Sequence, residues 1–208
     1  MNYKKIKRHT LPLLAAFIIG IGVLVIDGQT SVNSVKPNAA EIGFAQDMSV
    51  HHQQAIEMSF LVRETSNDPD ILGFAFDIIN TQAAQRGMML GWLDLWEQPF
   101  TTTQQPMMWM MEDMSMTDHQ QMMNDFTPSA YMQGMATSEE MNTLTKFNGL
   151  DAEQLFLELM IRHHKSGVMM AEGVIKRSDN ETVVRLAQAM INGQEAEIDY
   201  MKGLLLRY

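Results

Sequence analysis

Two pairs of adjacent histidines are the strongest chemical feature of this 208-residue sequence. A methionine precedes each pair by three residues, and another methionine follows it. Residues three or four apart lie on one face of a helix, so sulfur and imidazole atoms would share that face. Both groups are copper ligands. The predicted metal-binding residues are Met48, His51, His52, Met58, Met160, His163, His164 and Met170.

The two histidines of a pair cannot point in the same direction on a helix, because adjacent residues are turned by about 100°. One should face the interior of a helical bundle and the other a neighbouring helix, and the spacing leaves open which of them binds metal. The alternative interpretation is that all are neutral core residues with hydrogen-bonded nitrogens. Gln82 and Gln194 could support histidine tautomers, or they could be polar residues at a groove of the hairpin. We expect Glu195, Glu197 and Asp199 on a solvated acidic face, with assistance in metal capture as the alternative role.

The composition narrows the identity of the metal. Di-iron bundles use Glu-x-x-His, a motif that this chain lacks, and Met48 and Met160 occupy the positions of those glutamates. Neutral thioethers favour Cu(I) over zinc, magnesium and iron, although the histidines could also hold Cu(II), and Ag(I) should mimic Cu(I). The chain has no cysteine, which excludes thiolate zinc sites, iron–sulfur clusters and cysteine nucleophiles.

A methionine-rich segment between the histidine pairs predicts a second kind of site. Positions 107–135 hold ten of the 21 methionines of the chain. Flexible thioethers on such a segment could wrap Cu(I), and neighbouring aspartates make part of it polar rather than core-like. The alternative is an adaptable packing or docking surface, a role that methionine also fills. The candidate ligands here are Met114, Met116, His119 and Met123.

The sequence is internally duplicated. Residues 41–93 and 153–205 share sixteen identities without a gap, all at the constant offset that separates His51 from His163. An offset kept over that length indicates two copies of one structural unit. Within each copy, apolar residues recur at helical spacing on both sides of a central break, which predicts a helical hairpin.

Two such hairpins predict an all-α fold, a ferritin-like antiparallel four-helix bundle. The bundle is expected to form a single domain at 41–208, with repeat units at 41–97 and 151–207 and a long methionine-rich crossover at 98–150. Local signals predict the helix ends. These signals are Pro69 as the first residue of a helix, Thr137 with Glu140 at the start of a short helix ending at Gly149, and two further capping pairs, Asp151 with Gln154 and Ser178 with Glu181.

The N-terminus predicts export. Four basic residues precede an uncharged stretch that ends at Asp27, so residues 1–26 are interpreted as an export signal or an uncleaved anchor, and 27–40 as a tether. The remaining chain has 11 basic and 25 acidic residues, a net charge of −14. That charge disfavours nucleic acid and anionic membrane as partners. We expect a periplasmic or extracellular protein that touches membrane only through an uncleaved N-terminal segment.

The second copy also resembles a known family. The residues that carry the resemblance are Gly134, Met135, Glu140, Met141, Gly149, Asp151, Phe156, Met160, His163, His164, Gly167 and Met170. This pattern is similar to that of exported copper-binding proteins of the CopM type, which are ferritin-like bundles with paired histidines. The resemblance covers roughly residues 40–206. It implies periplasmic copper binding and copper resistance, with histidines and methionines as ligands.

These observations predict a non-enzymatic protein that sequesters or transfers copper outside the cytoplasm. Its expected partners are copper ions and a copper exporter or sensor protein. Two alternatives are a ferritin-like enzyme that oxidises Cu(I) or iron, and a metal-free interaction module that docks through the methionine-rich segment. Dioxygen consumption would distinguish the enzyme, and metal analysis would distinguish the interaction module.

Overall fold

The computed structural model describes residues 36–111, 115, 117 and 131–208, and all regular structure in this part is helical. No strand occurs among these residues, which confirms the predicted all-α fold. The predicted export signal and the candidate ligands Met114, Met116, His119 and Met123 lie outside the described residues. The helices are α1 (Ala39–Thr65), α2 (Pro69–Leu95), the 3-10 helix η1 (Met108–Met110), α4 (Ser138–Leu144), α5 (Leu150–Ile175) and α6 (Glu181–Leu205).

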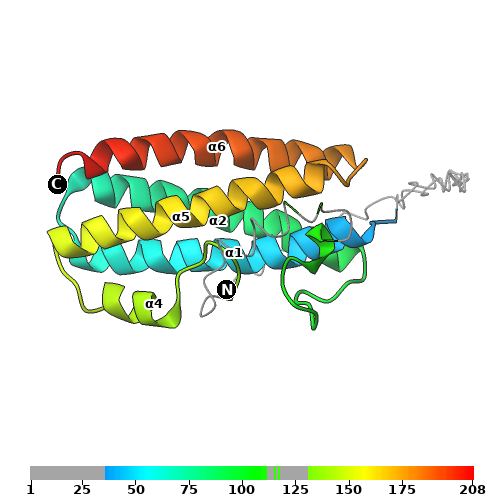
Figure 1. Ribbon diagram of the computed structural model, residues 1–208, viewed down its shortest axis with the longest axis horizontal. Helices are drawn as coiled ribbons and strands as arrows, with labels where there is room; N and C mark the ends of the chain where they lie inside the picture. The colour runs from blue at the N-terminus through cyan, green and yellow to red at the C-terminus, as the bar shows by residue number, and fades with distance from the viewer. Residues whose placement is uncertain (1–35, 112–114, 116, 118–130) are drawn as a thin grey trace, which may run out of the picture. The chain divides into compact units, whose positions relative to one another are not determined.

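The four long helices form two antiparallel hairpins, α1 with α2 and α5 with α6, which meet along α1 and α5 (Figure 1). Two equivalent hydrogen bonds join the hairpins. The Ser66 hydroxyl donates to Glu153 Oε1 at 2.5 Å, and the Ser178 hydroxyl donates to Glu41 Oε1 at 2.6 Å. Each bond joins the end of one of these helices to the start of the other. The duplicated units are therefore related by a pseudo-twofold axis between α1 and α5.

The crossover extends along the bundle. Near its start, the Pro99 carbonyl accepts a hydrogen bond from Gln46 Nε2 in the first half of α1 (2.7 Å). At its end, the Gly149 amide donates to the Thr65 carbonyl at the last turn of α1 (3.0 Å). The connection thus returns the chain to the end of the bundle where α2 began, so α5 runs antiparallel to α1. One long crossover of this kind is typical of ferritin-like bundles.

Two of the predicted helix starts are confirmed. Pro69 is the first residue of α2, after the N-cap Asp68. Thr137 and Glu140 form a reciprocal capping box at the start of α4, although this helix ends at Leu144 and not at Gly149. The start of α1 was not predicted: Asn38 and Glu41 form a capping box, so Ala39 and Ala40 are helical and do not belong to a tether.

Two predicted capping pairs are wrong. The N-cap of α5 is Gly149, with φ 57°, and no side chain caps this helix, so Asp151 lies inside its first turn. The N-cap of α6 is Asn180, whose side chain accepts from the Thr182 amide. Ser178 lies before that N-cap: its hydroxyl accepts from the Asn180 backbone amide at 3.1 Å and donates to Glu41 in α1. The serine therefore joins the two hairpins and does not cap the first turn of α6.

The core consists of two apolar clusters rich in methionine. Phe44 and Val174 belong to the cluster near the start of α1, and Phe156 and Val62 belong to the cluster near its end. The buried methionines of the first are Met48, Met89, Met107, Met110, Met132, Met135, Met170 and Met190, and those of the second are Met58, Met160 and Met201. The paired histidines occupy the part of α1 and α5 between the clusters.

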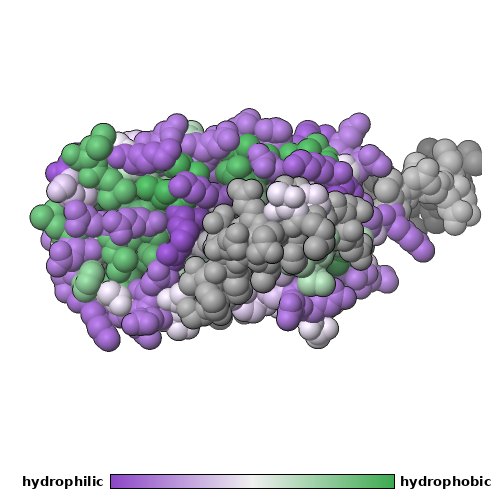
Figure 2. All heavy atoms as spheres, viewed as in Figure 1, coloured by the Kyte–Doolittle hydropathy of each residue, from purple (hydrophilic) through white to green (hydrophobic). Residues whose placement is uncertain are grey.

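Polar side chains cover much of the face in Figure 2, and hydrophobic atoms are more exposed toward the end of the bundle where α5 begins. Within the described part of the chain, the search for helices long and apolar enough to cross a membrane finds none.

Candidate metal centre

The four paired histidines form one fully buried layer across the bundle. All four side chains are 0 % exposed, and they come from the middle of α1 and of α5. The rings of His51 and His163 stack across the pseudo-twofold axis, with centroids 3.6 Å apart and planes inclined by 27°. His52 instead contacts α2 and His164 contacts α6. Each pair therefore divides as helical geometry requires, one ring toward the axis and one toward a neighbouring helix.

Three of the histidines have one ring nitrogen held by an oxygen atom. His52 Nε2 lies 2.8 Å from Gln85 Oε1, and His164 Nε2 lies 2.5 Å from Glu197 Oε2. His163 Nε2 lies 3.0 Å from the carbonyl oxygen of His51. Carbonyl and carboxylate oxygens only accept hydrogen bonds, so Nε2 carries the hydrogen in each case. In a neutral imidazole with this tautomer, Nδ1 holds a free lone pair.

The remaining ring nitrogens have no partner. Among the described residues, no hydrogen bond reaches Nδ1 of any of the four histidines or Nε2 of His51. A buried polar group left unpaired costs about 1–3 kcal/mol. Five such atoms are a large cost against a typical total stability of about 5–15 kcal/mol. The core interpretation, in which every nitrogen is satisfied, therefore does not describe this layer.

Three of the four histidines, His51, His52 and His163, are held in the neutral form that coordinates metal. Burial, together with the other histidines of the layer, lowers the pKa of His51 and His163 well below the ordinary value. Burial also lowers the pKa of His52 to about 4, with smaller contributions from His164 and the nearby Arg86. Neutral imidazole is the ligand form of histidine, so these three side chains do not have to lose a proton to bind metal at neutral pH.

The four candidate methionines of α1 and α5 lie on both sides of the histidine layer. Met48 and Met170 belong to one apolar cluster, and Met58 and Met160 belong to the other. All four are 0 % exposed. Each copy thus contributes one methionine to each side, which places thioether sulfur above and below the imidazoles. Their role as ligands stays a prediction.

The layer offers nitrogen and sulfur rather than oxygen. Among the described residues, no group of three or more histidine, aspartate and glutamate side chains is close enough to hold a metal ion. The stacked rings of His51 and His163 cannot direct in-plane lone pairs at an ion between them. Metal binding would therefore require a ring rotation or sulfur ligands from the flanking clusters.

The residues that support the histidines were not those expected from the sequence. Gln82 and Gln194 are buried, but neither bonds a histidine, and both amide atoms of Gln82 lack a partner. Glu197, expected on a solvated face, bonds His164 and is only 24 % exposed. One signal could have found these partners. Gln85 and Glu197 themselves occupy equivalent positions of the two copies, although they are not identical.

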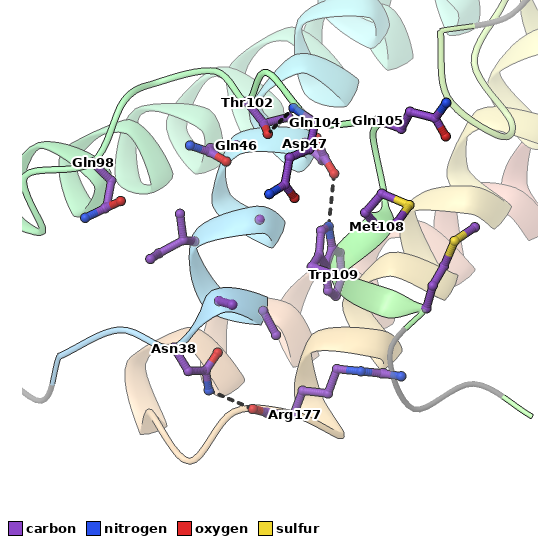
Figure 3. Close-up of a pocket in the computed structure, with 15 residues that line it drawn as sticks. Asn38, Gln46, Asp47, Gln98, Thr102, Gln104, Gln105, Met108, Trp109 and Arg177 are labelled. Carbon is purple, nitrogen blue, oxygen red and sulfur yellow. Dashed lines mark hydrogen bonds between the residues drawn. The ribbon is translucent and has the colours of Figure 1, made fainter.

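A groove in the described part lies away from the histidines, beside the start of α1 (Figure 3). Its volume is about 960 Å³, and its walls come from α1, from residues 98–111 and from Arg177. Asp47, at the side of this groove, is buried, and its Oδ2 accepts from the Met107 amide (2.7 Å) and from Trp109 Nε1 (3.0 Å). Burial raises the pKa of Asp47, although these two bonds oppose the shift. Asp47 thus fixes the first part of the crossover against α1.

The sequence profile of a domain of unknown function, DUF305, matches residues 41–205, which include both hairpins and the histidine layer. The chain belongs to the DUF305 family. Two solved structures of this family are similar to it. A DUF305 protein from Streptomyces coelicolor, described as secreted, has 44 % identity over 81 % of this chain and 93 % of its own, with a TM-score of 0.70. A DUF305 fragment from Deinococcus radiodurans has 32 % identity over 82 % and 98 %, with a TM-score of 0.63.

The DUF305 fold is also similar to that of CopM, which has been solved in apo, Cu(I)-bound, Cu(II)-bound and Ag-bound forms. The Cu(I)-bound form has 21 % identity over 80 % of this chain and 96 % of its own, with a TM-score of 0.60. At this identity, the structural similarity establishes a shared fold and nothing more. No curated protein matches the chain.

Proposed function

We propose that this DUF305 protein binds copper, chiefly Cu(I), outside the cytoplasm, and that it sequesters or transfers the metal without catalysing a reaction. The observation that carries the proposal is the set of unpartnered Nδ1 atoms in the buried histidine layer. In His52, His163 and His164 an oxygen holds Nε2–H, which leaves Nδ1 as the free donor. Histidines that bind metals are oriented in this way, through the ring nitrogen that does not bind.

The donors favour copper over other metals. Imidazole nitrogen suits copper and zinc, and thioether sulfur selects Cu(I). Iron and manganese sites in such bundles are built from glutamates that project inward. Here the positions of those glutamates hold Met48 and Met160, both fully buried. The similarity to CopM, which was solved with Cu(I), Cu(II) and silver bound, supports the same metal class.

The predicted export of the protein supports a role in copper resistance. The basic N-terminus and the uncharged stretch that follows it are typical of export, and a relative at 44 % identity is described as secreted. We infer that the protein lowers the concentration of free copper in the periplasm and can pass the metal to an exporter or a sensor. The acidic body, with a net charge of −14 after residue 26, would attract the cations.

An anaerobic competition titration with a coloured Cu(I) chelator tests the proposal on the full chain. His52→Gln combined with His164→Gln should abolish the tight binding of at least one copper ion. Met48→Leu combined with Met160→Leu should weaken binding about tenfold, or about 1.4 kcal/mol. The matched control is Met89→Leu with Met201→Leu, because these methionines are equally buried and also occupy equivalent positions of the two copies. Copper bound no more tightly than by a weak chelator would contradict the proposal.

The same samples test two further points. Copper bound through histidine should be released as the pH falls far enough to protonate the imidazoles, whereas sites made only of methionine should keep it. Stoichiometric binding with no dioxygen consumption is expected, since we propose no enzymatic activity. Sustained dioxygen turnover with Cu(I) or ferrous iron would favour a metal oxidase instead.

A further inference from the structure

The two halves of the histidine layer have the same imidazoles but different supporting residues. In the first copy, His52 Nε2 is held by the side-chain amide oxygen of Gln85. In the second, His164 Nε2 is held by the carboxylate of Glu197. The supporting residue follows its histidine by 33 positions in both copies. The duplication thus contains an internal comparison, in which the histidine is unchanged and the charge of its partner differs.

A carboxylate holds an imidazole more firmly than an amide does. The bond to Glu197 measures 2.5 Å and the bond to Gln85 measures 2.8 Å. Hydrogen bonds to an ionised acceptor are roughly twice as strong as neutral ones. A glutamine side chain can also turn to present its NH₂ group, which would favour the other tautomer, whereas both oxygens of a carboxylate accept. Nδ1 of His164 is therefore the better-defined and more basic donor.

The surrounding charges increase this difference. Arg86, beside Gln85, donates from Nε to the Ser49 carbonyl at 3.2 Å and acts on His52 as a nearby positive charge. The equivalent position in the second copy is Ile198, which is buried and uncharged. A cation that enters the layer would meet like charge near His52 and opposite charge near His164. In a buried site such differences are weakly screened and therefore large.

Glu197 also connects the layer with solvent. It lines a groove of about 420 Å³ between α2 and α6, together with Asp77, Tyr200 and Asp70, whose carboxylate is paired with Arg207. Its side chain is 24 % exposed, whereas His164 is fully buried. Partial hydration lowers the cost of keeping a carboxylate next to buried groups.

The positions related to these acidic residues by the pseudo-twofold axis are not acidic. The positions equivalent to Asp70, Asp77 and Glu197 hold Thr182, Ala189 and Gln85. None of these three carries a charge. The half of the layer around His164 is thus the one with an anionic and solvent-connected support.

We propose that Glu197 is a positioning residue that makes the His164 half of the layer its stronger copper site. It fixes the Nε2–H tautomer of His164, leaves Nδ1 free for the metal, and compensates the charge of the bound ion. Copper fills this half first. Because Cu(II) carries more charge than Cu(I), Glu197 strengthens the binding of Cu(II) more. This inference rests on the proposed function, since it takes the histidine layer as the copper site.

The test compares three single variants of the full chain. Glu197→Gln removes the charge and keeps the size of the side chain, and Gln85→Glu introduces the same change in reverse. The matched control is Glu195→Gln, an exposed position on the same helix. Thermal unfolding followed by circular dichroism should show that all three variants fold.

The first measurement needs no metal. Nitrogen-15 NMR of the metal-free protein reports which ring nitrogen carries the hydrogen, and a His164→Gln spectrum assigns the signals. In the unaltered chain and in Glu195→Gln, His164 should be a pure Nε2–H tautomer. In Glu197→Gln it should become a mixture. An unchanged His164 tautomer in Glu197→Gln would overturn the positioning role, whether or not the chain binds copper.

The second measurement is copper affinity. Glu197→Gln should weaken Cu(II) binding by about 10–100-fold, the usual effect of losing a residue that supports a metal ligand. Its effect on Cu(I) should be smaller, and Gln85→Glu should strengthen Cu(II) binding. Equal affinities of Glu197→Gln and the unaltered chain would overturn this inference and leave the proposed function intact. Failure of the unaltered chain to bind copper would overturn the proposed function itself.

Discussion

At the scale of single residues, the buried histidines combine a cost in stability with a capacity for chemistry. His51 has no partner for either ring nitrogen, and its ring lies against that of His163. Their burial keeps both imidazoles neutral, because a charged ring in this layer would lack solvent and would face other rings. A layer with unpaired donors and acceptors destabilises the apolar core around it. A bound metal ion would use these lone pairs, so copper should stabilise the fold.

The first prediction is that the metal-free protein loses stability in mild acid. Histidines of the unfolded chain take up protons with the ordinary pKa of 6.5, whereas burial lowers the pKa of folded His52 to about 4. The pKa values of folded His51 and His163 are also lowered. Between these values the unfolded state binds more protons, so the free energy of unfolding falls as the pH falls. His52 alone should account for about 3 kcal/mol, at 1.36 kcal/mol for each unit of pKa shift.

Urea denaturation at several pH values measures this effect. His52→Gln should show a shallower dependence than the unaltered chain, because a neutral amide replaces one of the three titrating rings. Burial raises the pKa of Asp47, so this group makes the free energy of unfolding rise as the pH falls. We expect the three histidines to outweigh this single carboxyl group. Equal unfolding free energies at about pH 7.5 and about pH 4.5 would contradict the prediction.

At the scale of elements, the first part of α1 packs closely against the start of the crossover. Gly43 lies directly under Trp109, and a Cβ atom built on this glycine would lie 2.6 Å from Trp109 Cγ and 2.8 Å from its Cβ. Asp47, one turn further along α1, accepts the Trp109 indole N–H. The glycine permits the close approach and the carboxylate fixes it. Together they attach η1 to α1.

The second prediction compares two glycine substitutions. Gly43→Ala should cost roughly 1–3 kcal/mol, because the added methyl overlaps the Trp109 side chain. Gly91→Ala, inside α2, should stabilise by roughly 0.5–1 kcal/mol, since nothing lies within 4 Å of its built Cβ and alanine favours helix. Thermal unfolding measures both values.

Hydrogen exchange should localise the effect of Gly43→Ala to residues 107–111. Exchange in this segment should increase in that variant and stay unchanged in Gly91→Ala. A Gly43→Ala protein as stable as Gly91→Ala, with an unchanged crossover, would contradict the contact between α1 and Trp109.

At the scale of the whole molecule, the duplication determines how the hairpins are joined. The same serine and glutamate positions form a bond at each end of the α1–α5 interface. Each carboxylate also accepts a second hydrogen bond, Glu41 from the Asn38 amide and Glu153 from the Tyr208 hydroxyl. The pseudo-twofold axis therefore brings the histidine layer to the middle of the interface, where the two copies face each other.

The third prediction is that these two bonds contribute equally and independently. Ser66→Ala and Ser178→Ala should each cost about 1–3 kcal/mol, because each leaves a buried carboxylate oxygen without its hydroxyl donor. The bonds lie at opposite ends of the bundle, so the cost in the double variant should equal the sum within about 0.5 kcal/mol. Chemical denaturation measures all three. A double variant no less stable than either single one would contradict independence.

The amino-acid sequence by itself determined the helices, the duplication and the chemistry of the layer. Helical spacing is a local property, so the positions of His51, His52, His163 and His164 on α1 and α5 could be predicted from it. A repeat without gaps also requires that both copies fold alike, which is why an all-α bundle with facing histidines followed from the constant offset between the copies.

Only the tertiary structure decided which side chains support the histidines and where the crossover attaches. The contacts of His52 with Gln85, His164 with Glu197 and Asp47 with Trp109 join residues 33 to 62 positions apart. Such contacts depend on the rotation of one helix against the next, which local periodicity leaves free. The contact of Ser178 with Glu41 in α1 is of the same kind. The predicted cap at Asp151 failed for a local reason, because α5 begins at Leu150 after the N-cap Gly149.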